Sequence, residues 1–118
     1  MKDILLIGID GGASKVSGWE IIFDKKNGTF QTGTANSLKY YSEIPGFLPD
    51  FSPVPVPEQF AQRDNNNIKQ TDDEAQQETV YVEACAQVIE ELCENNSGRK
   101  VLAGIGMPGL KTEDRRGI

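Results

Sequence analysis

The spacing of apolar residues in the first third of the chain predicts three strands. A continuous apolar run over residues 3–9 is typical of a strand covered on both faces, and strand-forming residues also dominate 15–23 and 29–35. The turn between the last two stretches contains Asn27-Gly28, a strong hairpin signal. We therefore expect three antiparallel strands joined by hairpins to open the fold.

A helical pattern follows over residues 73–95, where apolar residues recur at spacings of three and four. The sequence Asn95-Asn96-Ser97-Gly98 predicts the end of this helix, and an apolar run over 100–106 predicts a fourth strand. A strand that follows a crossover helix lies parallel to its partner, so we expect the fourth strand beside the first. The predicted fold is α/β with the order β-β-β-α-β.

Residues 36–75 fit neither pattern. Five prolines lie between positions 45 and 57, and the stretch 62–73 is almost entirely polar. Prolines in this number are expected to exclude a helix, and connections of this length inside small domains are usually functional lids or disordered. We interpret the segment as a long irregular insertion in one domain that spans residues 1–118.

The end of the first strand carries the residues with the most chemical content. Asp10 follows the apolar run directly and precedes Gly11, Gly12, Ala13 and Ser14. A carboxylate fixed at a strand end can face a hydrated Mg²⁺, which prefers oxygen ligands and keeps several waters. Glycines allow close backbone approach, so amide N–H groups can meet phosphate oxygens, and the Ser14 hydroxyl adds a donor. The pattern predicts a strand-turn-strand site for phosphate and its metal.

Two better-known phosphate motifs do not occur at this turn. A P-loop needs G-x-x-x-x-G-K-[ST] and a dinucleotide fold needs G-x-G-x-x-G, and both open a helix. Here the turn leads into residues 15–23, which predict a strand. An ordinary hairpin, in which Asp10 accepts hydrogen bonds from backbone amides, is the alternative interpretation of the same string.

The string IGIDGGASKVSGWEI at residues 7–21 resembles the first phosphate motif of the actin, sugar kinase and Hsp70 superfamily, roughly D-x-G-[GA]-[ST]-K. Residues 104–109 resemble the G-x-G-x-P-G segment of ROK-type sugar kinases. Ala13 stands where ROK sequences usually have a second glycine, and the GGAS form is similar to N-acetylglucosamine kinase and BadF-type relatives. The resemblance covers residues 3–35 and 76–118.

The resemblance implies the amino-terminal ribonuclease H-like lobe of an actin-like ATPase fold, a partial domain whose second lobe is absent. It implies that Asp10 holds the Mg²⁺ of MgATP through water. It also implies a sugar-side wall within residues 37–57. The phosphate contacts that it implies are Gly11, Gly12, Ala13, Ser14 and Lys15, and the implied substrate-side loop contains Gly106, Pro108 and Gly109.

The implied activity is that of an ATP-dependent, ROK or glucokinase-like sugar kinase, with ATP and Mg²⁺ as cofactors and a small sugar as the second substrate. The catalytic base and the adenosine motif of such kinases have no counterpart among these 118 residues. Asp50 and Asp114 could be proposed as substitutes for the base, but solvated loop residues are the simpler interpretation. We therefore assign no catalytic residue and expect the chain to be inactive alone.

The composition of the chain excludes several classes of binding partner and of catalytic chemistry. The net charge of −6 argues against a nucleic-acid or anionic membrane partner, and the lack of histidine removes Ser-His, Cys-His and His-zinc chemistry. No apolar run is long enough to span a membrane and the start is charged, so a cytoplasmic location is expected. Cys85 and Cys93 lie about 12 Å apart along the predicted helix, too far to bridge, and we interpret them as buried thiols.

Three other classes of protein remain as alternatives. A sugar-binding regulator or a self-associating scaffold of the same superfamily needs no catalytic base, and an isolated half-fold exposes a sheet edge through which it can form homo-oligomers. A ribonuclease H-like metal nuclease also begins with an aspartate on its first strand, but it needs several converging carboxylates. The fourth predicted strand, residues 100–106, carries no acid.

Overall fold

A computed structural model of the chain describes residues 4–94, 96 and 98–107. Its elements follow the predicted order, with one additional α-helix and one short 3-10 helix between the third strand and the long helix. In chain order they are β1 (Ile4–Gly11), β2 (Lys15–Asp24), β3 (Thr29–Tyr40), η1 (Tyr41–Glu43), α1 (Val56–Asp64), α2 (Asp72–Cys93) and β4 (Lys100–Gly106).

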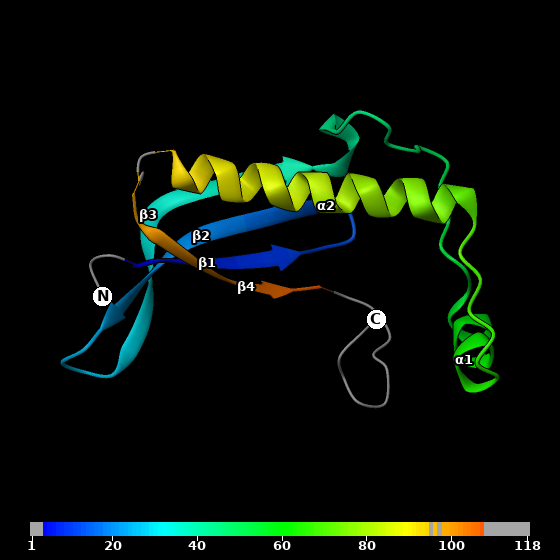
Figure 1. The fold of residues 1–118 in the computed structure, drawn as a ribbon, viewed down its shortest axis with the longest axis horizontal. Helices are drawn as coiled ribbons and strands as arrows, with labels where there is room; N and C mark the ends of the chain where they lie inside the picture. Colours follow the sequence, from blue (N-terminus) through cyan, green and yellow to red (C-terminus); the bar gives the residue numbers. More distant parts are fainter. Residues whose placement is uncertain (1–3, 95, 97, 108–118) are drawn as a thin grey trace.

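The four strands form one mixed sheet in the order β3-β2-β1-β4 (Figure 1). β1 pairs antiparallel with β2, and β2 pairs antiparallel with β3. β4 lies parallel to β1 and in register with it, from Ile4 opposite Lys100 to Asp10 opposite Gly106. The antiparallel meander and the parallel fourth strand are both confirmed, and the chain has an α/β fold.

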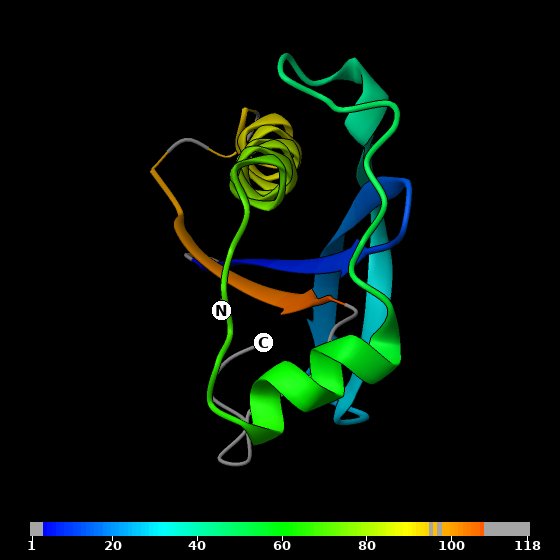
Figure 2. The same cartoon turned by 90° about the vertical axis from the view of Figure 1, so that its right-hand side faces the viewer.

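The core lies between α2 and one face of the sheet, as the end-on view of the helix shows (Figure 2). Alternate residues of β1 point toward the helix, and the helix contributes a stripe at every fourth position, as its 3.6-residue turn requires. Gly18 of β2 lets the helix come close, since a Cβ there would lie 2.5 Å from Cγ1 of Val88. The core residues of these two elements are Leu5, Ile7, Ile9, Val80, Ala84, Val88 and Leu92.

A capping box starts α2. The Thr71 hydroxyl accepts the Glu74 backbone N–H at 3.1 Å, and the Glu74 carboxylate accepts the Thr71 N–H at 3.0 Å. Asp72 and Asp73 add negative charge to the first turn, where the helix dipole favours it. The predicted start at residue 73 is thus close. Of the predicted stop signal, Asn95 and Ser97 lie outside the described residues.

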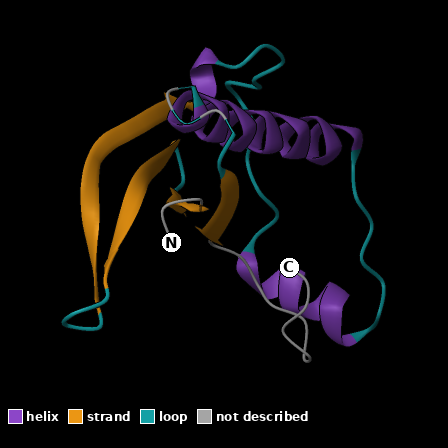
Figure 3. Ribbon diagram, turned by 60° about the vertical axis from the view of Figure 1, so that its left-hand side comes forward, coloured by secondary structure: helices purple, strands orange, loops and turns teal. Residues whose placement is uncertain are grey.

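The prediction that prolines exclude a helix from residues 36–75 is wrong. Pro55 is the residue before the first turn of α1 and Pro57 lies inside that turn, where proline has no hydrogen bond to lose. The insertion also begins later than expected, because β3 continues to Tyr40. α1 lies well away from α2 and is joined to its neighbours by extended segments (Figure 3).

The expectation that β1 is covered on both faces is wrong for the described residues. Leu5, Ile7 and Ile9 are buried under α2, whereas the alternate positions, among them Leu6, are only partly buried. α2 packs against β1, β2 and β3 on the face that carries Leu5, Ile7 and Ile9. None of the described helices combines the length and apolar composition that crossing a bilayer requires.

Candidate functional site

Asp10 lies at the carboxyl end of β1, where β1 and β4 run side by side. Its neighbours across the sheet are Gly106 of β4 and Ser17 of β2. Because side chains alternate along a strand, Asp10 projects from the face opposite buried Ile9, and it is exposed. The sheet therefore brings Asp10 and Gly106 to one rim, whereas Pro108 and Gly109 lie outside the described residues.

The turn after Asp10 is a tight connection between β1 and β2. Gly12 donates its N–H to the Lys15 carbonyl at 2.8 Å, and Ala13 and Ser14 form the exposed tip. The Lys15 ammonium is also exposed and lies 5.9 Å from the centre of the Tyr40 ring, which is within the range of a cation–π contact. One carboxylate, one hydroxyl and one cation thus lie within six consecutive residues.

Gly11 has a packing role that the sequence did not reveal. The residue is buried, and the side chain of Met107, which follows β4, occupies the position that a Cβ on Gly11 would take. A side chain at position 11 would therefore displace Met107 from its place beside Gly11. A phosphate contact at Gly11 stays a prediction, and its backbone would have to make that contact. Gly12 is only partly buried.

A residue from outside the motif holds the turn. Tyr41 of η1 donates its phenol hydrogen to the Gly12 carbonyl at 2.8 Å and its backbone N–H to the Ser14 carbonyl at 3.0 Å. Its ring is buried and packs against Tyr81 of α2, with 4.5 Å between ring centroids. Burial raises the pKa of the Tyr41 phenol to about 12, so the phenol stays protonated and able to donate.

The side chains near Asp10 fit a hydrated metal ion better than a metal ion held by protein ligands alone. Among residues 4–94, 96 and 98–107, no three His, Cys, Asp or Glu side chains gather in one place, so a site built entirely from protein ligands is not formed there. A hydrated Mg²⁺ needs only one or two carboxylates, with water and phosphate oxygens completing its shell. The exposed Asp10 fits that second arrangement.

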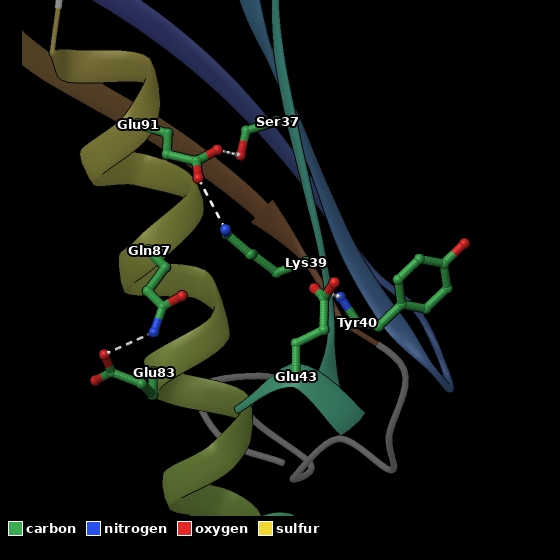
Figure 4. Close-up of polar contacts among 7 residues, drawn as sticks. All are labelled: Ser37, Lys39, Tyr40, Glu43, Glu83, Gln87 and Glu91. Carbon is green, nitrogen blue, oxygen red and sulfur yellow. Dashed lines mark hydrogen bonds and ion pairs between the residues drawn. The ribbon is translucent and has the colours of Figure 1, made fainter. Parts of the chain in front are cut away.

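A second polar cluster joins β3 to α2 (Figure 4). The Glu91 carboxylate accepts a hydrogen bond from the Ser37 hydroxyl and lies 2.8 Å from the Lys39 ammonium. Its hydrogen bonds with Lys39 and Ser37 lower the pKa of Glu91, and Glu91 in turn raises the pKa of Lys39. The start of the predicted sugar-side wall, residues 37–40, therefore belongs to the sheet.

The structure also places the two cysteines, on α2, and the glycines near the end of β4. Cys85 and Cys93 are free thiols on α2, each partly buried, and burial raises the pKa of Cys85. Gly104, Gly106 and Gly109 match the spacing of the dinucleotide fingerprint. However, β4 runs through Gly104 and Gly106, whereas that fingerprint places its first glycine in the turn after a strand.

Comparisons of the chain with models of protein families, with curated proteins and with solved structures give no match.

Proposed function

We propose that the rim at Asp10 is the magnesium-phosphate site of an ATP-dependent sugar kinase of the ROK or N-acetylglucosamine kinase type, in the amino-terminal ribonuclease H-like lobe. One observation carries this proposal. An exposed carboxylate ends a strand, directly beside the end of a parallel strand and directly before a tight turn with an exposed tip. The carboxyl ends of parallel strands are where α/β proteins bind ligands.

Each residue of the rim has a role that its position supports. The Asp10 carboxylate accepts hydrogen bonds from waters of the metal ion and so orients the ion relative to the turn. The Ser14 hydroxyl and the amides at the tip donate to phosphate oxygens, and the Lys15 ammonium adds positive charge. Bound MgATP supplies the phosphoryl group and the charge neutralisation for its transfer. The sugar side of the rim falls to Gly106 and, by the resemblance, to Pro108 and Gly109.

The metal nuclease alternative finds less support at this rim. Two-metal hydrolysis needs several carboxylates around the ions. The residue of β4 that pairs with Asp10 is Gly106, which offers no side chain. No second carboxylate therefore faces Asp10 from that strand.

Self-association is a second proposal, and a separate observation favours it. β4 forms one edge of the described sheet, and Val101, Leu102 and Ile105 on it are 45%, 63% and 51% exposed. Beyond Lys100 the strand has no charge, proline or bulge, the features that usually protect a sheet edge. We propose a second copy of this chain as the partner, paired edge to edge about a twofold axis. In such a contact β4 of each copy pairs with β4 of the other, so the same strand forms both halves of the interface.

The magnesium-phosphate site is tested by calorimetric titration of the chain with ATP, with and without Mg²⁺. We expect weak binding that requires Mg²⁺ and that Asp10→Asn weakens at least about tenfold, since one lost charge-assisted contact is worth roughly 1.5–3 kcal/mol. Asp50→Asn, which changes an exposed loop carboxylate, is the matched control and should leave binding unchanged. Binding that survives Asp10→Asn, or that ignores Mg²⁺, would refute the assignment.

A further inference from the structure

One residue of the core, Tyr41, holds the turn between β1 and β2. Tyr41 contacts it twice, through the phenol at the Gly12 carbonyl and through the backbone N–H at the Ser14 carbonyl. The Tyr41 ring is 1% exposed and rests on Tyr81 of α2. The hydrogen bond from Tyr41 to Gly12 spans 29 residues of sequence, and the Tyr41 ring connects the exposed turn to α2.

These two hydrogen bonds determine which way two peptide groups of the turn face, the one between Gly12 and Ala13 and the one between Ser14 and Lys15. No peptide bond in the described chain is cis, and in a trans peptide the C=O and the next residue's N–H point in opposite directions. With the Gly12 carbonyl directed at the buried Tyr41 phenol, the Ala13 N–H is directed away from it. With the Ser14 carbonyl directed at the Tyr41 backbone, the Lys15 N–H likewise faces the opposite side.

The donors at the tip have no competing acceptor in the described protein. Among residues 4–94, 96 and 98–107, neither the Ala13 N–H nor the Ser14 N–H donates to another protein group. Both residues are exposed. The tip therefore presents two unused backbone donors, and the Ala13 N–H belongs to the peptide group that the Tyr41 phenol holds in place. Oriented, unused backbone donors are what backbone anion sites require.

We propose that Tyr41 is a positioning residue of the phosphate turn, whose phenol holds the Gly12 peptide so that the Ala13 N–H faces a bound phosphate. The identity of the ligand rests on the proposed function, whereas the claim that the Tyr41 phenol holds the Gly12 peptide does not. Gly12 has little conformational restraint of its own, because glycine lacks a Cβ. The phenol supplies the restraint from the core side, out of contact with the ligand.

Tyr41→Phe is the sharpest test, because it keeps the ring, the Tyr81 contact and the backbone hydrogen bond and removes only the phenol donor. Tyr40→Phe removes the hydroxyl of the neighbouring, 44% exposed tyrosine and is the matched control. We expect ¹⁵N relaxation to show the Ala13 and Ser14 amides falling from near 0.85 to below about 0.6 in order parameter in Tyr41→Phe only. Affinity for MgATP should fall about 2- to 13-fold, the effect of one net hydrogen bond.

The outcomes separate this inference from the proposed function. Unchanged order at Ala13 and Ser14 overturns the positioning role, whatever the nucleotide does. Loss of order with undiminished MgATP affinity also overturns it. Loss of order in a chain that binds no MgATP at all supports the positioning role and removes the kinase proposal instead.

A measurement on the unaltered chain covers the case in which Tyr41→Phe fails to fold. The hydrogen-bonded Tyr41 hydroxyl proton should exchange slowly with water and be visible by NMR, close to the amides of the turn. The Tyr40 hydroxyl serves as the internal reference. A Tyr41 hydroxyl that exchanges as fast as that of Tyr40 would overturn the inference.

Discussion

The close packing of α2 on Gly18 predicts that Gly18→Ala destabilises the fold. A Cβ at position 18 would lie 2.5 Å from Cγ1 of Val88 and 3.2 Å from Cδ1 of Leu92. Carbon atoms pack best about 3.5–4.0 Å apart, so the nearer contact is too close by roughly 1 Å. Val88 cannot easily rotate away, because a β-branched side chain in a helix has one strongly preferred rotamer. The helix must therefore shift away from the sheet.

The expected magnitude follows from two opposing terms. Overpacking of a well-packed core costs about 1–3 kcal/mol, whereas replacing glycine by alanine in an accessible conformation restores about 0.4–1 kcal/mol through the unfolded state. The net loss in the free energy of unfolding is then about 1–2 kcal/mol. For a domain of this size that loss corresponds to a fall of roughly 5–10 °C in the unfolding midpoint.

Gly104→Ala is the matched control, since the same change on β4 meets nothing within 4 Å. Urea unfolding followed by far-ultraviolet circular dichroism should show Gly104→Ala as stable as the unaltered chain or slightly more stable. Adding Val88→Ala to Gly18→Ala removes the obstructing methyl group, so the double variant should be at least about 1 kcal/mol more stable than the sum of the single changes. Strict additivity, or a Gly18→Ala variant as stable as Gly104→Ala, would refute the reasoning.

Three further predictions follow from other contacts. Glu91→Gln should lower the free energy of unfolding, with its full effect between pH 4.5 and 10.5. The reason is that the pKa of Glu91 is lowered from 4.5 and that of its partner Lys39 is raised from 10.5. The difference should vanish in acid, as the pH falls through the lowered pKa of Glu91, and in alkali, as it rises through the raised pKa of Lys39; a pH-independent difference in urea midpoint would contradict this. Thr71→Ala should cost about 1 kcal/mol by the same assay through loss of the helix cap, and Thr71→Ser should cost little; equal losses would argue against the cap. Leu102→Lys should shift sedimentation equilibrium toward monomer, whereas Val82→Lys, at a residue 62% exposed on α2, should not; a similar response to both would remove the proposed β4 contact.

Local pattern was enough to predict the main elements. The continuous apolar runs predicted β1 and β4, and the Asn27-Gly28 pair predicted the hairpin between β2 and β3. The pairing of β4 with β1 followed from the connection between them, because a crossover helix leaves little choice of direction. The position of Asp10 beside Gly106 could therefore be predicted without coordinates.

The errors arose where one residue type serves two structural purposes. Prolines disrupt a helix interior but are tolerated in a first turn, and only the location of the start, at Val56, distinguishes the two cases in α1. Ser37 and Lys39 fell within the segment predicted to be irregular, yet they lie on β3 and meet a carboxylate from α2. Polar residues on a strand are indistinguishable from loop residues until their partner in the other layer is known.

The restraint on the turn between β1 and β2 could not have been predicted from the turn itself. Gly12 and Ser14 carry no signal for the tyrosine that holds them, because that contact depends on where β3 ends. Tyr41 follows β3 directly, and β3 pairs with β2 up to Lys15 opposite Tyr40, so the register of one hairpin delivers Tyr41 to the turn of the other. The Tyr41 ring then meets Tyr81 on the same helix that Gly18 allows close to the sheet. The geometry of the turn is thus a property of the packed layers, and the short motif at Asp10 supplies only the groups that this packing orients.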